Sequence, residues 1–165
     1  MSTLLETADT ETLKSRSTEI VGKMLESDSD LYEAAGLKPE NIEALYSVGY
    51  AFYKAGNYAE AETIFCSLCF YNTRNKRNWL ALGGAAQALK NFDSALIAYS
   101  FAQLLDLMDP EPVVRTYECH LEAGNIDRAI ESIQILLEMT KDRPGLSEIH
   151  RQAEFLLNEI RQSLV

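Results

Sequence analysis

The stretch that decides the fold is NWLALGGAAQALKNFDSALIAY, residues 78–99, because its marks recur on either side at a fixed interval. An asparagine and an alanine four residues after it both recur every 34 residues. These positions are Asn57, Asn91 and Asn125, with Ala61, Ala95 and Ala129. Glycine keeps the same step at Gly49 and Gly83, and a large apolar residue keeps it at Phe65, Tyr99 and Ile133. A 34-residue period with small and aromatic marks indicates stacked helix–turn–helix units.

The composition agrees with a folded, acidic protein. The chain has 165 residues, 47% of them hydrophobic and 24% charged, which is enough for one globular domain. Its net charge of −10 argues against nucleic acid or an anionic membrane surface as partner. The beginning, residues 1–12, is polar, and no apolar run approaches a membrane span, so we expect a soluble intracellular protein. Three cysteines do not suggest a disulfide scaffold.

The periodicity predicts an all-α chain organised around three repeats. We expect them at about 42–75, 76–109 and 110–143, inside a region that spans 39–144. The first repeat should consist of a helix over 42–55, a turn at Gly56-Asn57 and a helix over 58–71. The repeated asparagines are expected to accept left-handed backbone geometry and to cap the following helix.

The two ends of the chain carry amphipathic patterns of their own. Residues 1–38 read as a tail followed by a helical extension, in which one apolar face over 10–25 predicts self-association. That face comprises Leu13, Ile20, Val21, Met24 and Leu25. Residues 145–165 predict a last helix that covers the exposed face of the final repeat. Its apolar side comprises Ile149, Ala153, Leu156, Leu157 and Ile160.

The repeat marks resemble the tetratricopeptide consensus. The second repeat supplies Trp79, Leu82, Gly83, Phe92, Ala95, Tyr99 and Ala102, and the first supplies Leu45, Val48, Gly49, Phe52, Ala61, Phe65 and Leu68. The third repeat departs from it, since Thr116 and Tyr117 stand where leucine and glycine are usual. The resemblance implies a superhelix whose concave face receives another polypeptide.

A narrower resemblance is to the class II chaperones of bacterial type III secretion. It is carried by Leu45-Tyr46-Ser47-Val48-Gly49-Tyr50 with Tyr53 and Gly56, Ile64-Phe65, Leu68-Cys69, Leu82-Gly83-Gly84-Ala85, Ala98-Tyr99-Ser100 and Glu118-Cys119-His120-Leu121. The resemblance implies a homodimer in the bacterial cytoplasm that holds hydrophobic translocator proteins, with no cofactor. A short segment of the translocator would lie in the groove, with proline and leucine side chains in its pockets.

In such repeats a fixed set of first-helix positions lines the concave face. The candidate client-binding residues at these positions are Tyr46, Tyr50 and Tyr53, then Leu80, Gly84 and Gln87, then Val114, Glu118 and Leu121. The intervening positions, such as Val48, should pack the core. The three tyrosines are spaced 4 and 3 residues apart and so form one stripe. With the small Gly84 opposite and the amide of Gln87 to pair with a peptide bond, the groove suits an extended apolar segment.

Other interpretations of the sequence lead to different functions. The tyrosine stripe could pack against the N-terminal extension or a dimer partner instead of a client. A generic tetratricopeptide scaffold for soluble partners is the chief alternative function, and a regulatory role acting through protein contacts is a further one. A carboxylate clamp for chaperone tails is disfavoured, because the groove carries Tyr46, Tyr50 and Glu111 rather than clustered cations.

No pattern in the sequence indicates catalysis or a metal. Cys66 and Cys69 have the spacing of a redox or zinc pair, but two further ligands would be needed, so we expect both to pack in the core of the first repeat. Gly83-Gly84 falls inside a predicted helix and is therefore not a phosphate-binding loop. We expect no enzyme activity.

Overall fold

The computed structural model describes residues 30–163, and all regular secondary structure in this range is helical. The elements are α2 (Leu31–Ala34), α3 (Pro39–Lys54), α4 (Tyr58–Tyr71), α5 (Lys76–Ala88), α6 (Phe92–Leu105), α7 (Glu111–Glu122), α8 (Ile126–Thr140), the 3-10 helix η1 (Pro144–Leu146) and α9 (Ser147–Ser163). The second helix of the first repeat has the predicted bounds, whereas the first begins three residues earlier, at Pro39. The five residues expected to form a dimer contact lie outside the described part of the chain.

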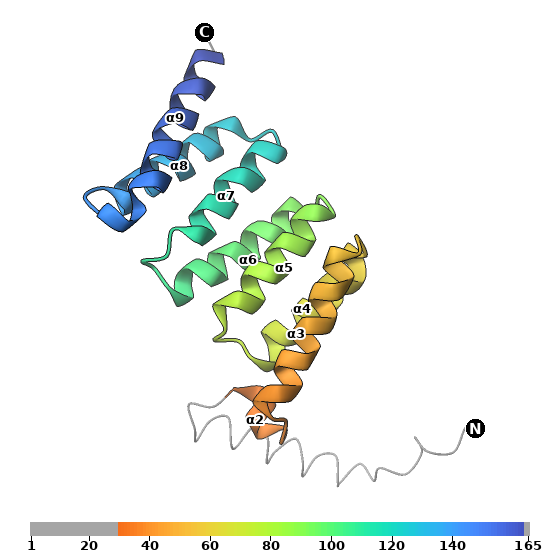
Figure 1. Ribbon diagram of the computed structural model, residues 1–165. Helices are drawn as coiled ribbons and strands as arrows, with labels where there is room; N and C mark the ends of the chain where they lie inside the picture. The colour runs from red at the N-terminus through yellow and green to blue at the C-terminus, as the bar shows by residue number, and fades with distance from the viewer. Residues whose placement is uncertain (1–29, 164–165) are drawn as a thin grey trace, which may run out of the picture.

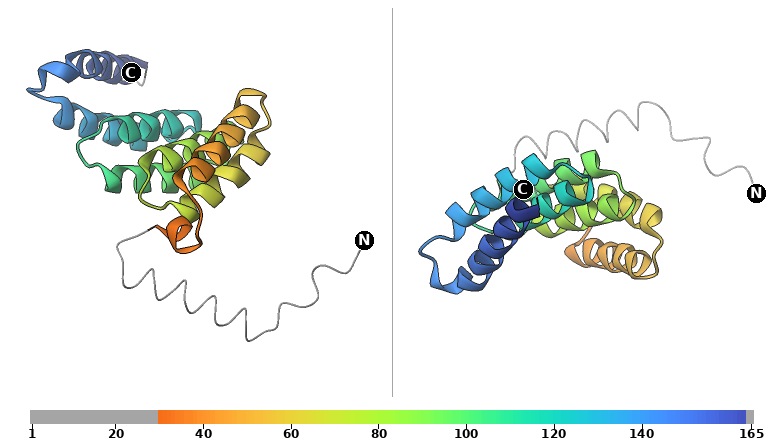
Figure 2. Two further views of the ribbon diagram at one scale, coloured as in Figure 1. Left: turned by 60° about the horizontal axis from the view of Figure 1, so that its bottom comes forward. Right: turned by 90° about the horizontal axis from the view of Figure 1, so that it is seen from above.

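The helices follow one another along a single direction, from α2 at one end to α9 at the other (Figures 1 and 2). Each pair, α3 with α4, α5 with α6 and α7 with α8, contacts mainly the pair before and after it. This is the tetratricopeptide superhelix that the 34-residue period predicts. Because every unit buries its apolar face only against its neighbours, the ends of the stack need their own cover.

The turns between paired helices use a different residue from the one expected. The left-handed residue is the one before each asparagine: Gly56 with φ of 80°, Lys90 with φ of 61° and Gly124 with φ of 75°. The asparagines themselves have φ between −84° and −87°. Of the three, only Asn91 accepts a capping hydrogen bond, from the backbone N–H of Ser94. Within the predicted turns, the left-handed conformation was therefore assigned one residue too late.

In each of the first two repeats, a glycine on the first helix packs against an aromatic ring on the second helix. A Cβ atom on Gly49 would lie 2.9 Å from the Phe65 ring, and one on Gly83 would clash with the Tyr99 ring. Both rings are almost completely buried. In the third repeat the bulk is exchanged between the helices, because Tyr117 occupies the glycine position and Ile133 the aromatic position.

The last helix covers the third repeat as expected. Ala153, Leu157 and Ile160 of α9 are buried in one cluster with Ile133 and Leu136 of α8. Ile149 and Leu156 pack against the edge of that cluster. The apolar stripe read from the sequence is thus the surface that closes the array, since it replaces the contacts a fourth repeat would make.

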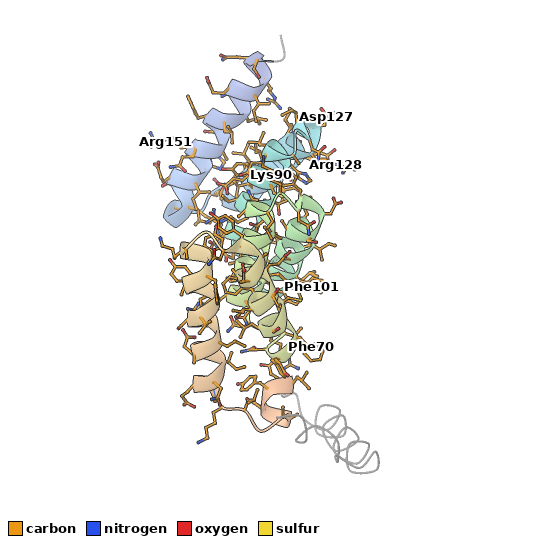
Figure 3. The ribbon with its side chains drawn as sticks, turned by 90° about the vertical axis from the view of Figure 1, so that its right-hand side faces the viewer. Phe70, Lys90, Phe101, Asp127, Arg128 and Arg151 are labelled. Carbon is orange, nitrogen blue, oxygen red and sulfur yellow. The ribbon has the colours of Figure 1, made fainter. Side chains whose placement is uncertain are left out.

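Two residues expected in the core are on the surface. Val48 is 47% exposed on α3, and Cys66 is exposed on α4 while Cys69 is buried. Cys66 borders a surface cavity that Trp79 of α5 and Ile97 of α6 also line. The surface also carries large apolar side chains at Phe70 and Phe101, which project from one edge of the molecule in Figure 3.

Candidate peptide-binding groove

The first helices of the three repeats enclose a cavity of about 430 Å³. Seven of the nine candidate client-binding residues line it, so the structure brings them together from α3, α5 and α7. They are Tyr46, Tyr50, Tyr53, Leu80, Gly84, Gln87 and Glu118. The cavity is open on one side, as a groove for an elongated ligand must be.

Helix α3 forms an aromatic wall. The rings of Tyr46 and Phe65 have centroids 5.4 Å apart, and those of Tyr53 and Tyr58 are 5.2 Å apart in an edge-on arrangement. These contacts hold two of the three tyrosines in place from the second helix of the same repeat. Tyr50, between them on the stripe, is 50% exposed. An apolar side chain of a ligand that covers Tyr50 would therefore remove much of its ring from water.

An ion pair borders the aromatic wall. Arg77 on α5 binds both carboxylate oxygens of Glu43 on α3, at 3.0 and 2.9 Å. Its guanidinium also lies 3.5 Å from the centroid of the Tyr46 ring, as a cation–π contact. The pairing of these two charges was not predicted from the sequence. The sequence does contain a signal for this pairing, because Glu43 and Arg77 are 34 residues apart and so occupy equivalent positions in successive repeats.

Helix α5 forms the floor of the groove, and Gly84 leaves space there because it has no side chain. A Cβ atom on Gly84 would be 3.9 Å from the Tyr53 hydroxyl, so the residue faces the aromatic wall across open space. Alanine would fit at this position, whereas a larger side chain would fill the groove. This agrees with the expectation that Gly84 lets a ligand approach the helix closely.

Gln87 differs from the expectation that its amide is free to bind a peptide. The Tyr99 hydroxyl donates a hydrogen bond of 2.7 Å to its Oε1, and its Nε2 donates one of 2.8 Å to Glu122. Tyr99 belongs to α6 but reaches the cavity because Gly83 has no side chain in its way. Burial raises the pKa of Tyr99 above its ordinary value, so the hydroxyl stays a donor. Gln87 thus links the second repeat to the third.

Helix α7 forms a charged wall. It contributes Glu111, Arg115, Glu118 and Glu122 to the lining of the cavity. Arg115 pairs with Glu118 at 3.1 Å and more loosely with Glu111 at 3.7 Å. Of these four residues, Glu118 was a client-binding candidate and Glu111 was already placed in the groove from the sequence. Arg115 and Glu122 were not, and they line the cavity because they share one helix face with Glu118.

The two remaining candidates lie outside this cavity. Val114 lines an adjoining cavity of about 470 Å³ between α7, η1 and α9, which shares Glu111, Arg115 and Glu118 with the groove. Leu121 packs half-buried against the core formed by α8 and α9. Val114 thus borders α9, and Leu121 belongs to the C-terminal core.

The described residues hold no cluster of histidine, cysteine and acidic side chains suited to a metal. Burial raises the pKa of the Cys69 thiol to about 12 and that of the Cys119 thiol to about 11, so neither is a ready thiolate. Within residues 30–163, no helix combines the length and the apolar character that crossing a membrane requires.

Comparisons with known proteins agree with this geometry. A family profile described as tetratricopeptide repeat matches residues 42–75. The low calcium response locus protein H of Yersinia pseudotuberculosis is 27% identical over 125 residues, which cover 76% of this chain and 74% of that protein. The structure of the Yersinia enterocolitica chaperone SycD with a peptide of the translocator YopD has a TM-score of 0.68 and 26% identity, over 78% of this chain and 98% of that one.

PcrH, a protein of Pseudomonas aeruginosa, has been solved in complex with the chaperone binding region of PopB. It is 30% identical to this chain with a TM-score of 0.66, and the match covers 74% of this chain and 98% of PcrH. Fold and groove together define a tetratricopeptide protein with a concave site for an extended ligand. Within that class, the chain belongs to the class II translocator chaperones of type III secretion.

Proposed function

We propose that this protein binds an extended segment of a hydrophobic translocator in the groove between α3, α5 and α7. The observation that carries the proposal is the cavity itself, whose aromatic wall meets a floor kept open by Gly84. The complexes of SycD with a YopD peptide and of PcrH with the PopB region support the same use of the fold. The contact residues are those of the candidate set that line the cavity.

The mechanism is burial of apolar side chains without catalysis. A translocator carries stretches that aggregate or insert into membranes when they are exposed in the cytoplasm, where we place this chaperone. Each aromatic or aliphatic anchor buried against Tyr46, Tyr50 or Leu80 contributes about 1.5–3 kcal/mol. Three such anchors support binding of about micromolar strength once the cost of association is subtracted. That strength holds the client in the cytoplasm and still permits release for secretion.

Self-association belongs to the same proposal. The apolar face over residues 10–25 supplies the contact, and a structure of SycD described as an alternative dimer supports it. Sedimentation that shows a monomer at high concentration would contradict this part without affecting the groove. The alternative function, a scaffold for soluble partners, would use the same groove with hydrophilic clients.

The test is a pull-down from the native bacterium with the wild type and a Tyr46/Tyr50/Tyr53→Ala variant. We expect the wild type alone to recover a protein with long apolar segments. The matched control is Ile135→Ala, which removes a 56% exposed side chain on α8, outside the groove. Circular dichroism must show that all three proteins are equally helical. Recovery of only hydrophilic proteins would favour the scaffold, and equal recovery by all variants would move the client site elsewhere.

A further inference from the structure

The cavity is asymmetric in charge. All four charged residues that line it belong to α7, and α3 and α5 contribute neutral side chains only. On the charged wall three carboxylates face a single guanidinium, that of Arg115. Carboxylates on an open surface would be solvated by water and would not indicate the charge of a ligand. Here they form one wall of the groove whose opposite wall is aromatic, so any segment in the groove meets them.

The described part of the chain supplies one positive charge, that of Arg115, against the three carboxylates of this wall. Arg115 is shared between Glu118 and Glu111, and the hydrogen bond that Glu122 accepts comes from the neutral amide of Gln87. A ligand that fills this end excludes water and lowers the local dielectric constant, which makes an unpaired carboxylate more costly. A cation on the ligand would remove that cost.

The aromatic end of the groove does not offer a comparable place for a cation. Tyrosine rings do attract cations, but Arg77 already lies over Tyr46 and is itself balanced by Glu43. A second cation beside this ring would be repelled by the guanidinium. The two ends therefore differ in what they accept, with apolar groups at α3 and positive charge at α7.

We propose that the bound segment carries a lysine or arginine that docks against Glu118 and Glu122 while its apolar anchor lies against Tyr46 and Tyr50. A helix with its side chains is about 10–12 Å across, so α3 and α7, with α5 between them, are separated by about 20 Å. An extended chain advances about 3.3 Å per residue, which puts the basic residue about six positions from the anchor. This inference rests on the proposed function and names the chemistry of its ligand.

The test uses three labelled twelve-residue peptides that share one proline–leucine anchor. Six positions from the anchor they carry lysine, the neutral isostere norleucine, or glutamate. Binding is measured by fluorescence anisotropy with the full-length protein. We expect the lysine peptide to bind about three- to tenfold more tightly than the norleucine peptide, and the glutamate peptide most weakly. The advantage of lysine should shrink as salt is raised.

Variants of the protein assign the effect to the charged wall. Glu118→Gln with Glu122→Gln should abolish the preference for lysine, because it should weaken the lysine peptide much more than the norleucine peptide. The matched control, Glu138→Gln with Glu159→Gln, changes the net charge equally at exposed positions outside the cavity and should keep the preference.

Equal binding of the lysine and norleucine peptides to the wild type would overturn the inference and leave the proposed function intact. Equal weakening of both peptides by the groove variant would also overturn it, because the carboxylates would then act through structure. If none of the peptides binds, and the tyrosine variant recovers the same proteins as the wild type, then the groove is not the client site and the proposed function fails.

Discussion

The second and third repeats place their large and small side chains on opposite helices at the contact between the paired helices. In the second, Gly83 on the first helix receives the ring of Tyr99 from the second helix. In the third, Tyr117 on the first helix packs against the core cluster that contains the smaller Ile133 of the second helix. The contact between paired helices thus depends on the summed volume at the two positions, while either helix can supply it.

The difference also affects the groove. Tyr99 passes over Gly83, and its hydroxyl reaches Gln87 at 2.7 Å, so the core of the second repeat supports the binding site. Ile133 has no polar end and supports only the C-terminal core. We therefore expect changes to the buried Tyr99 of the second repeat to affect both stability and binding, and changes to the buried Ile133 of the third to affect stability alone.

The largest effect should come from Tyr99→Ala. Removing a ring that is only 1% exposed leaves a cavity, and we expect the free energy of unfolding to fall by about 3–5 kcal/mol. Client binding should weaken as well, because Gln87 loses its donor. The counterpart Ile133→Ala should cost about 2–4 kcal/mol and leave binding unchanged. Urea unfolding and anisotropy measure the two effects, and equal loss of binding in both variants would contradict the comparison.

The next effect tests whether bulk can be exchanged between the helices. Gly83→Ala should cost about 1–3 kcal/mol, because the buried Tyr99 ring has little room to move. Tyr117→Gly should also destabilise, since Ile133 is too small to fill the space. Adding Ile133→Tyr to Tyr117→Gly copies the second repeat and should restore part of the loss. A double variant no more stable than Tyr117→Gly alone would show that the two positions do not compensate.

A smaller effect is expected from Tyr99→Phe, which removes only the hydroxyl. At neutral pH the lost hydrogen bond should cost about 1 kcal/mol. The pKa of Tyr99 is raised by burial, so above pH 10 the unfolded chain loses this proton before the folded one does. Stability of the wild type should therefore fall as pH rises beyond 10, and the variant should fall less steeply. Parallel curves in urea titrations at pH 9 to 11 would refute this.

The smallest effect concerns the turns. Lys90, marked in Figure 3, holds the left-handed conformation that glycine adopts at the equivalent Gly56 and Gly124. Lys90→Gly removes the steric cost of a side chain there and should stabilise the protein by at most about 1 kcal/mol. Gly124→Lys should destabilise by a similar amount. Thermal unfolding measures both, and a loss of stability in Lys90→Gly would mean that the lysine makes compensating contacts.

Much of this architecture could be predicted because the repeat length fixes it. Asn57, Ala95 and Gly83 lie in one register, and that register sets the helix pairs, the capping helix and most of the groove. The left-handed residue of each turn was misassigned by one position because asparagine and glycine both favour turns, and only backbone geometry separates their roles. Val48 was misassigned because consensus patterns assume a covering neighbour.

The charged wall was harder to predict for a different reason. Whether Glu122 or Leu121 faces the groove depends on a rotation of α7 by about 100°, the step between adjacent helix residues. The orientation of a helix depends on the elements that pack against it, and these are not visible in the pattern of one helix. The internal bonds of Gln87 were missed because its partners come from two different repeats.

The three cysteines differ in exposure, and this difference allows the protein to be labelled at a single site. Cys66 is exposed beside Trp79 and Ile97, on a surface that shares no lining residue with the groove, whereas Cys69 and Cys119 are 4% and 0% exposed. A maleimide dye should therefore label the native protein at one position without mutation. The label would report the arrival of a client, or of a second copy of the chain, from outside the groove.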